Sequence, residues 1–347
     1  MLDTIKLFIP DYDIASDSSL EVQPARFNAG TGEVLNEHEL FRTASGKRFR
    51  GSRAFLNTDK FNLDLKPFNF SENGVSCFLH FSIPKVYYGD NYYSTGEQGT
   101  EAVFNLIEKE LRENGFYCNL KKAHLSRIDT FKNIEPEESF ETYSALFNLL
   151  NASRRIKRSF GTTYMVTNNK QEFCVYDKLA ERELNKQDNS GLPKTMRFEH
   201  RLFSKEKISS VLGFTQVADL FKGGYAVIRD KRAESWRDNL FKYSVSEIVQ
   251  LGSQELALEM EHFARKHGER WFSWFLKAYG AFHLAQFAGV EVVEKALEYF
   301  EPNRMKISRM RKTLEEAERE LLFYREEPLT KKTYATLYEE LKEKVLA

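Results

Sequence analysis

Cysteine is scarce in this sequence: Cys77, Cys118 and Cys174 are odd in number and widely spaced. They match neither a disulfide framework nor a zinc-site spacing, so we expect a reducing, cytoplasmic setting. Apolar runs are short, and none approaches the roughly eighteen residues that a membrane-spanning helix needs. The first residues, MLDTIKLFIPDYDI, carry acidic side chains and a proline where a signal peptide needs basic and apolar ones. They predict a first strand instead, and no membrane contact.

Net charge is also absent, because 51 basic residues balance 51 acidic ones. This balance excludes a protein that coats DNA by overall charge alone. It leaves open a local basic patch, which is all that salt-dependent phosphate contacts require. A glycine-rich loop of the GxxxxGK[ST] type is missing too, so the sequence predicts no ATPase activity of its own.

Aromatic residues are abundant, at 14% of the 347 residues, with 29 phenylalanines and 16 tyrosines. They are interpreted either as a phenylalanine-rich core or, in part, as rings that stack on unpaired bases. The hydrophobic share of 41% and the charged share of 29% are those of a globular protein with a sizeable core.

Apolar periodicity divides the chain into a mixed part and a helical part. Alternation and short apolar runs predict strands, and spacing of three to four residues predicts helices. The start of the chain, 1–14, predicts a first strand, and the other predicted strands are 75–83, 123–131, 161–169, 171–178 and 194–203. The predicted helices are 97–114 and 136–153. We expect an α+β domain over 1–230, with a central antiparallel sheet and flanking helices, followed by a helical region over 231–347 that binds DNA or a partner.

Three of the predicted strand segments place charged residues on one face. Arg127 and Asp129 alternate in SRIDTF, and Tyr176 and Lys178 alternate in VYDKLAERE, with Glu181 just beyond. In MRFEHRL, the residues that share a face are Arg197, Glu199 and Arg201. Such residues on a single strand usually mark its solvent face, but three such segments within about eighty residues favour a site.

Together these residues match metal-assisted transesterification of a phosphodiester. Carboxylates suit Mg²⁺ or Mn²⁺, and arginines grip phosphate oxygens in pairs. A tyrosine can act as the nucleophile, although an unperturbed phenol with a pKa near 10 is almost entirely protonated at neutral pH. A nearby cation lowers that pKa, and a metal ion on the scissile phosphate stabilises the developing charge.

Two basic runs are candidates for contact with DNA phosphates. One is SGKRFRGSR, with Lys47, Arg48 and Arg50, and the alternative interpretation is a solvated hairpin. The other is RRIKR, which precedes the tyrosine hairpin and is interpreted either as a phosphate contact or as a solvated face; it comprises Arg154, Arg155, Lys157 and Arg158.

The ordered set SRIDTF, FCVYDKLAERE and MRFEHRLFSKEKISSVLGF resembles the core of the gene II replication endonucleases of filamentous phages. It is more loosely similar to plasmid rolling-circle initiators of the Rep_trans type and to related relaxases. The resemblance is strong over about 120–220, faint over 1–119 and general beyond 230. It implies a rolling-circle nickase fold, distantly of the type whose metal site is a His-hydrophobe-His pair. This chain lacks that pair, and His80, His124 and His200 are interpreted as packed or exposed strand histidines, or as a single added ligand.

The resemblance implies a role for each residue of the set. Tyr176 would be the nucleophile that keeps the 5′-phosphate, with Lys178 beside it. Asp129 and Glu199 would be the metal ligands, with Glu181 as a third. Phosphate or structural carboxylates would be held by Arg127, Arg197 and Arg201.

These roles describe an enzyme that nicks one strand at a replication origin and later rejoins it. The expected partners are origin DNA, single-stranded or as a hairpin at the nick, together with a host helicase and polymerase; a homodimer is left open. Three rival hypotheses remain: a relaxase of a mobile element with the same chemistry, an origin-binding initiator without enzymatic activity, and a structural protein whose aromatics form a plain core.

Overall fold

The computed structural model describes residues 1–24, 26–27, 34–35, 38–43, 45–67, 75–150, 156–273, 275, 290–312 and 334–347. It divides into two compact units, each built from several stretches of the chain. The first unit comprises Met1–Lys132, Thr167–Cys174 and Phe198–Arg232. The second comprises Asn133–Val166, Val175–Arg197 and Ala233–Ala347. The predicted domains 1–230 and 231–347 stay a prediction, because compactness does not show which part folds by itself.

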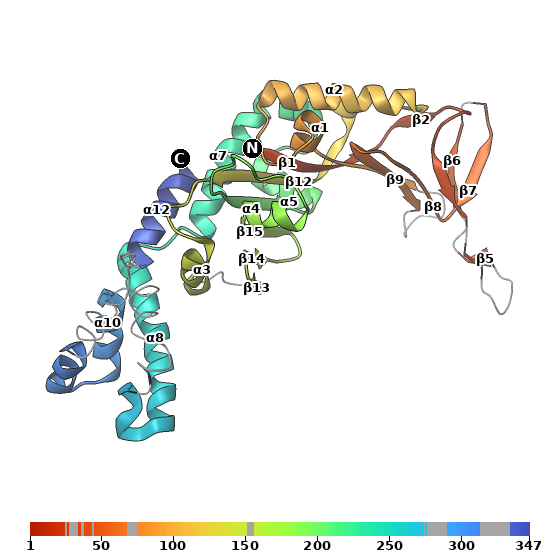
Figure 1. The fold of residues 1–347 in the computed structure, drawn as a ribbon. Coiled ribbons are helices and arrows are strands. Elements are labelled where there is room, and N and C mark those ends of the chain that lie inside the picture. Colours follow the sequence, from red (N-terminus) through yellow and green to blue (C-terminus); the bar gives the residue numbers. More distant parts are fainter. Residues whose placement is uncertain are drawn as a thin grey trace. The chain divides into compact units, whose positions relative to one another are not determined.

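The first unit is built on an antiparallel sheet (Figure 1). Its strands follow the order β15-β16-β12-β1-β10-β9-β8-β3. They are β1 (Leu2–Ile9), β3 (Glu21–Gln23), β8 (Arg53–Asn57), β9 (Phe61–Pro67), β10 (Val75–Ser82), β12 (His124–Ile134), β15 (Gln171–Asp177) and β16 (Met196–Leu202). Strands β12, β15 and β16 continue into the second unit.

Strict alternation buries one face of this sheet. Leu7 of β1 lies opposite Leu79 of β10, and Ile5 lies opposite Phe81. All four are buried. Helix α2 (Glu97–Glu113) covers this side (Figure 1). Its Phe104 meets Phe81 edge to face at 5.3 Å between ring centroids. The predictions of β10 and α2 are confirmed to within one residue at each end, and the strand predicted at the start of the chain is present as β1.

Shorter elements complete the first unit. Two small ladders pair β2 (Tyr12–Ile14) with β11 (Phe116–Cys118) and β4 (Arg26–Phe27) with β5 (Val34–Leu35). A third, β6 (His38–Arg42) with β7 (Arg48–Gly51), is the hairpin of the SGKRFRGSR segment. The other helices and helical turns of this unit are α1 (Ile83–Tyr88), η1 (Leu120–Lys122), α5 (Lys205–Leu212), α6 (Val217–Asp219), η2 (Leu220–Gly224) and the start of α7 (Tyr225–Asn239).

The second unit joins a small β-structure to the helical region. Strands β13 (Ile156–Phe160), β14 (Thr163–Thr167) and the end of β15 are consecutive in the strand order, and the turn after β14 is closed by Asn168, whose backbone N–H donates to the Gln171 carbonyl. Its helices are α3 (Phe140–Leu149), α4 (Lys178–Leu184), α8 (Val245–His267), the turn η3 (Gly268–Arg270), α10 (Val290–Phe300) and α12 (Tyr334–Leu346). Helices α8 and α10 pack side by side (Figure 1).

The predicted fold class is confirmed: the protein is α+β, with a large antiparallel sheet and a helical C-terminal region. One helix is shorter than predicted. The sequence favours 136–153, but α3 begins after Ser139 and ends at Leu149, because the backbone of Ser139 and of Leu150 is extended. Within the described residues, none of the helices is both long and apolar enough to cross a membrane.

Candidate functional site

Three buried carboxylates gather in the first unit. Asp129 of β12 is 3% exposed, Glu199 of β16 is 2% exposed and Glu172 of β15 is 8% exposed. Burying carboxylates is costly unless cations or hydrogen bonds compensate. Two arginines supply both here. Arg127 donates to Asp129 from Nε at 2.9 Å and from Nη2 at 2.7 Å. Arg201 donates to Glu199 from Nε at 2.9 Å and to Glu172 from Nη1 at 2.7 Å.

A β-bulge in β12 sets the direction of Arg127 and Asp129. Lys6 of β1 lies opposite Arg127, but Leu7 lies opposite Leu125, so Ser126 is the extra residue. The Ser126 hydroxyl donates to the Lys6 carbonyl at 3.0 Å. Bulges re-aim the side chains beside them and are common next to active sites. This one places Arg127 and Asp129 on the side of the sheet that does not carry the apolar core.

Burial raises the pKa of Asp129 to about 6, against the opposing pull of the Arg127 guanidinium. Because the folded value lies above the ordinary 3.8, the folded protein holds an extra proton between these pH values. The stability that this proton contributes is present below pH 3.8 and is lost as the pH rises through about 6.

We therefore expect the free energy of unfolding of the wild type, relative to Asp129→Asn, to fall by up to about 3 kcal/mol between about pH 4 and 7. Urea unfolding of both proteins in EDTA at a series of pH values measures this difference. Curves that stay parallel over the whole range would contradict the raised pKa of Asp129.

The second unit holds the predicted nucleophile. Tyr176 is 8% exposed near the end of β15. Helix α4 begins immediately afterwards, because the Asp177 side chain caps it by accepting from the backbone N–H of Leu179 at 2.9 Å and of Ala180 at 3.1 Å. Lys178 is thus the first residue of a helix rather than the last of a strand, which differs from the prediction by one residue.

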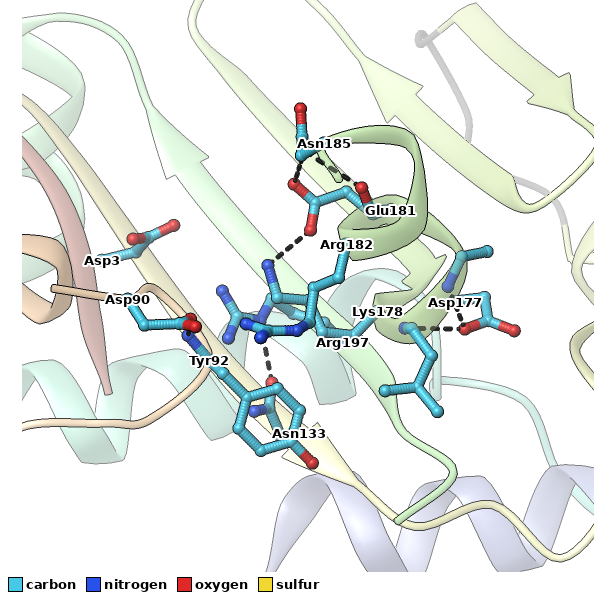
Figure 2. A network of polar contacts seen from close by, with 12 residues as sticks. Asp3, Asp90, Tyr92, Asn133, Asp177, Lys178, Glu181, Arg182, Asn185 and Arg197 are labelled. Atoms are coloured by element: carbon cyan, nitrogen blue, oxygen red, sulfur yellow. Dashed lines mark hydrogen bonds and ion pairs between the residues drawn. The ribbon is translucent and has the colours of Figure 1, made fainter. Parts of the chain in front are cut away.

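The Lys178 side chain is fully buried beside Tyr176. Its Nζ lies 5.9 Å from the centroid of the Tyr176 ring. Lys178 Nζ donates to Glu181 Oε2 at 2.6 Å, and both residues are drawn in Figure 2. Glu181 also accepts from Asn185 Nδ2 at 2.8 Å. A buried ammonium needs such a carboxylate partner, and Glu181 fixes its position one helical turn further on. Tyr176, Lys178 and Glu181 therefore form one group.

Arg197 lies in the second unit and is fully buried. Its Nε donates to Asn133 Oδ1 at 2.8 Å (Figure 2). Whether Arg197 binds a DNA phosphate or a structural carboxylate stays a prediction.

The basic segments are exposed where the structure describes them. Lys47 follows the turn of the β6–β7 hairpin, and Arg48 and Arg50 lie on β7; all three are exposed. So are Lys157 and Arg158 on β13. The two remaining basic residues of that run, Arg154 and Arg155, lie outside the described residues.

The histidines of the candidate strands are packed rather than clustered. His200 is 3% exposed and stacks on Phe173 at 4.3 Å between ring centroids. His124 lies within 3.5 Å of the Thr215 hydroxyl. In the described part of the chain, no group of three or more His, Cys, Asp or Glu side chains could hold a metal ion. The chain thus offers the pair Asp129 and Glu199, which fits Mg²⁺ or Mn²⁺, since such ions take one or two carboxylates and fill the other positions with water and substrate phosphate.

Two residues of the site were missed in the sequence. Glu172 alternates with Cys174 and Tyr176 in QEFCVYDK, so its spacing was a usable signal. Asn133 carried none, because its partner Arg197 lies in another strand.

A family model that describes the N-terminal part of a gene II-type replication-associated protein matches residues 63–244. This range covers more than half of the chain and includes Asp129, Tyr176, Lys178 and Glu199. A comparison with curated proteins finds no match. The matched range also extends well before residue 120, where the sequence resemblance was faint. The chain therefore belongs to this family of phage replication-associated proteins and is a gene II-type initiator of rolling-circle DNA replication.

Proposed function

We propose that this initiator nicks one DNA strand at an origin with Tyr176 as the nucleophile. The observation that supports the proposal best is the buried ammonium of Lys178, which Glu181 holds beside the Tyr176 ring. A cation in this place stabilises negative charge on the phenol oxygen as its proton leaves. Lys178 is fully buried and Tyr176 is 8% exposed, and this burial strengthens the electrostatic interaction between them.

The chemistry is a transesterification. The Tyr176 oxygen attacks the phosphorus and loses its proton to solvent, while the bond between phosphorus and the 3′-oxygen breaks. The 3′-oxygen takes up a proton and becomes the 3′-OH that a host polymerase extends, with a host helicase separating the strands. The tyrosyl ester conserves the phosphodiester energy, so a later attack by a 3′-OH rejoins the strand without ATP.

Asp129 and Glu199 would hold the Mg²⁺ or Mn²⁺ ion, whereas Glu181 is engaged by Lys178. Bound there, the ion would act as a Lewis acid on a phosphoryl oxygen. Arg127 and Arg201 fix the two carboxylates, so their oxygens stay oriented before substrate arrives. The exposed basic residues of β7 and β13 would contact phosphates along the DNA.

The test uses single-stranded origin oligonucleotides carrying a label at either end, incubated with protein and Mn²⁺ and run on a denaturing protein gel. We expect the 3′ label to migrate with the protein and the 5′ label to leave on a short free fragment, with neither product in EDTA. Free fragments from both ends would indicate a hydrolytic nuclease. Binding to every origin candidate without cleavage would favour the non-enzymatic initiator.

Lys178→Met is expected to slow adduct formation on the order of a hundredfold, because it removes one preorganised positive charge beside Tyr176. The adduct itself should be the same. Single-turnover rates on the labelled oligonucleotide measure the effect, and Lys194→Met, which changes an exposed lysine, is the control. An unchanged rate in a Lys178→Met protein that unfolds normally would remove Lys178 from the proposed mechanism.

A further inference from the structure

One face of the first unit's sheet carries side chains that the nicking chemistry does not use. Lys6 and Phe8 of β1 and Phe78 and His80 of β10 are half-buried and alternate with fully buried residues. Lys6 lies opposite His80 on one side and opposite Arg127 on the other, and Phe8 lies opposite Phe78. These side chains therefore share the face that carries Arg127 and Asp129.

Aromatic rings and a cation meet on this face. The rings of Phe8 and Phe78 lie 5.8 Å apart between centroids, tilted by 56°. The Lys6 ammonium lies 4.4 Å from the centroid of the Phe78 ring. Cross-strand aromatic pairs stabilise a sheet modestly, but the buried face already supplies the core here. Half-exposed rings beside a lysine make a stacking surface for flat ligands that carry negative charge.

Positive charge is concentrated around Lys6. Burial lowers the pKa of Lys6, and Lys66 and Arg127 lower it further. Burial, followed by the charges of Arg127 and Lys6, also lowers the pKa of His80, whose Nε2 is buried without a hydrogen-bond partner among the described residues. An anion at this place would relieve the repulsion between these groups.

The carboxylate of Asp64, on β9, shares the face with these basic groups and is already ion-paired. Asp64 forms ion pairs with Arg53 and, at 2.5 Å, with Lys66. Lys6, Lys66, Arg53 and Arg127 outnumber Asp64 and Asp129 on this face, so its balance is basic although the whole chain is neutral. Charge complementarity thus favours an anionic partner over a basic or neutral protein surface.

We propose that the face formed by β9, β10 and β1 binds single-stranded DNA. Unpaired bases stack on Phe8 and Phe78, and phosphates contact Lys6 and Lys66. A duplex keeps its bases stacked on one another and cannot offer their faces to these rings, so the face selects single strands. Because no base edge is addressed, binding tolerates different sequences. The inference rests on the initiator's use of DNA and does not depend on the chemistry at Tyr176.

The test measures binding of the full-length protein, in EDTA so that no strand is cleaved, to a fluorescein-labelled oligo(dT) of about 20 nucleotides, longer than the usual site. Phe8→Leu and Phe78→Leu keep an apolar side chain but remove the ring. Each is expected to weaken binding about five- to tenfold. Tyr117→Leu, at an exposed aromatic residue of β11, is the control and should bind normally.

Lys6→Gln gives a second readout that a purely structural role would not move. The slope of the logarithm of affinity against the logarithm of salt concentration should become less steep by about 0.7, the contribution of one phosphate contact to a single strand. Lys109→Gln, at an exposed lysine of α2, should leave the slope unchanged.

Normal binding by all three sheet variants, or equal affinity for a duplex of the same length with equal losses in the variants, would overturn the proposal. Because nothing is cleaved in EDTA, these outcomes are separate from success or failure of the nicking assay. Thermal unfolding of each variant guards against a trivial loss of fold.

Discussion

Tyr176→Phe is expected to form no covalent adduct with origin DNA and to bind that DNA as tightly as the wild type. Phenylalanine keeps the ring that packs near the end of β15 and removes only the oxygen that attacks phosphorus. Loss of a covalent nucleophile removes the step itself, so we expect the rate of nicking to fall at least about a thousandfold. Adduct formation on a 3′-labelled oligonucleotide and binding by fluorescence anisotropy measure the two properties.

Tyr164→Phe is the matched control for this prediction. Tyr164 lies on β14, is 1% exposed and stacks on Phe147 at 5.2 Å between ring centroids. Burial raises the pKa of Tyr164, and its hydroxyl makes no hydrogen bond among the described residues. The control should therefore nick normally. Normal nicking by Tyr176→Phe, or equal loss in both variants, would rule out Tyr176 as the nucleophile.

Asp129→Asn and Glu199→Gln are expected to lower the Mn²⁺-dependent nicking rate on the order of a hundred- to a thousandfold each. Both changes keep the size of a buried side chain and remove the charge that would hold the ion. Several kcal/mol of transition-state stabilisation would be lost with it. The rate measured over a series of Mn²⁺ concentrations should also show that each variant needs more metal than the wild type.

Glu172→Gln separates metal binding from the positioning of Arg201. Glu172 and Glu199 both accept from Arg201, so a change in either disturbs the same guanidinium. Of these two carboxylates, Glu199 is the one assigned to the metal. The Glu172→Gln protein should therefore retain most of the nicking activity and the Mn²⁺ dependence of the wild type. An equal loss in Glu172→Gln, without any shift in the Mn²⁺ requirement, would mean that the carboxylates act through Arg201 and hold no ion.

Most of the local structure could be predicted because it depends on short-range periodicity. Alternation of apolar residues in β1 identified the strand and its buried face, since successive side chains of a strand point to opposite sides. The same rule placed Arg127 and Asp129 together and Glu199 and Arg201 together, and the structure pairs each of them by hydrogen bonds. Gly115, with φ of 75°, ends the segment of α2 as predicted.

The arrangement across strands could not be predicted from one sequence. Lys6 and Arg127 are neighbours because β1 pairs with β12, and Arg201 reaches Glu172 on another strand. Such contacts depend on strand order and register, which no local pattern encodes. The extra residue Ser126 shifts the register within β12, and nothing in SRIDTF indicates it. The aromatic face of β1 and β10 was missed for the same reason.

The most direct test of the central claim identifies the residue that carries the DNA. Trypsin cleaves after Lys170 and Lys178, and the peptide between these sites, QEFCVYDK, contains Tyr176 as its single hydroxyl-bearing residue. After nuclease trimming of the covalent complex, mass spectrometry should find the residual 5′-phosphorylated nucleotide on this peptide. A nucleotide on any other peptide, such as the one that carries Tyr164, would contradict the assignment of Tyr176 as the nucleophile.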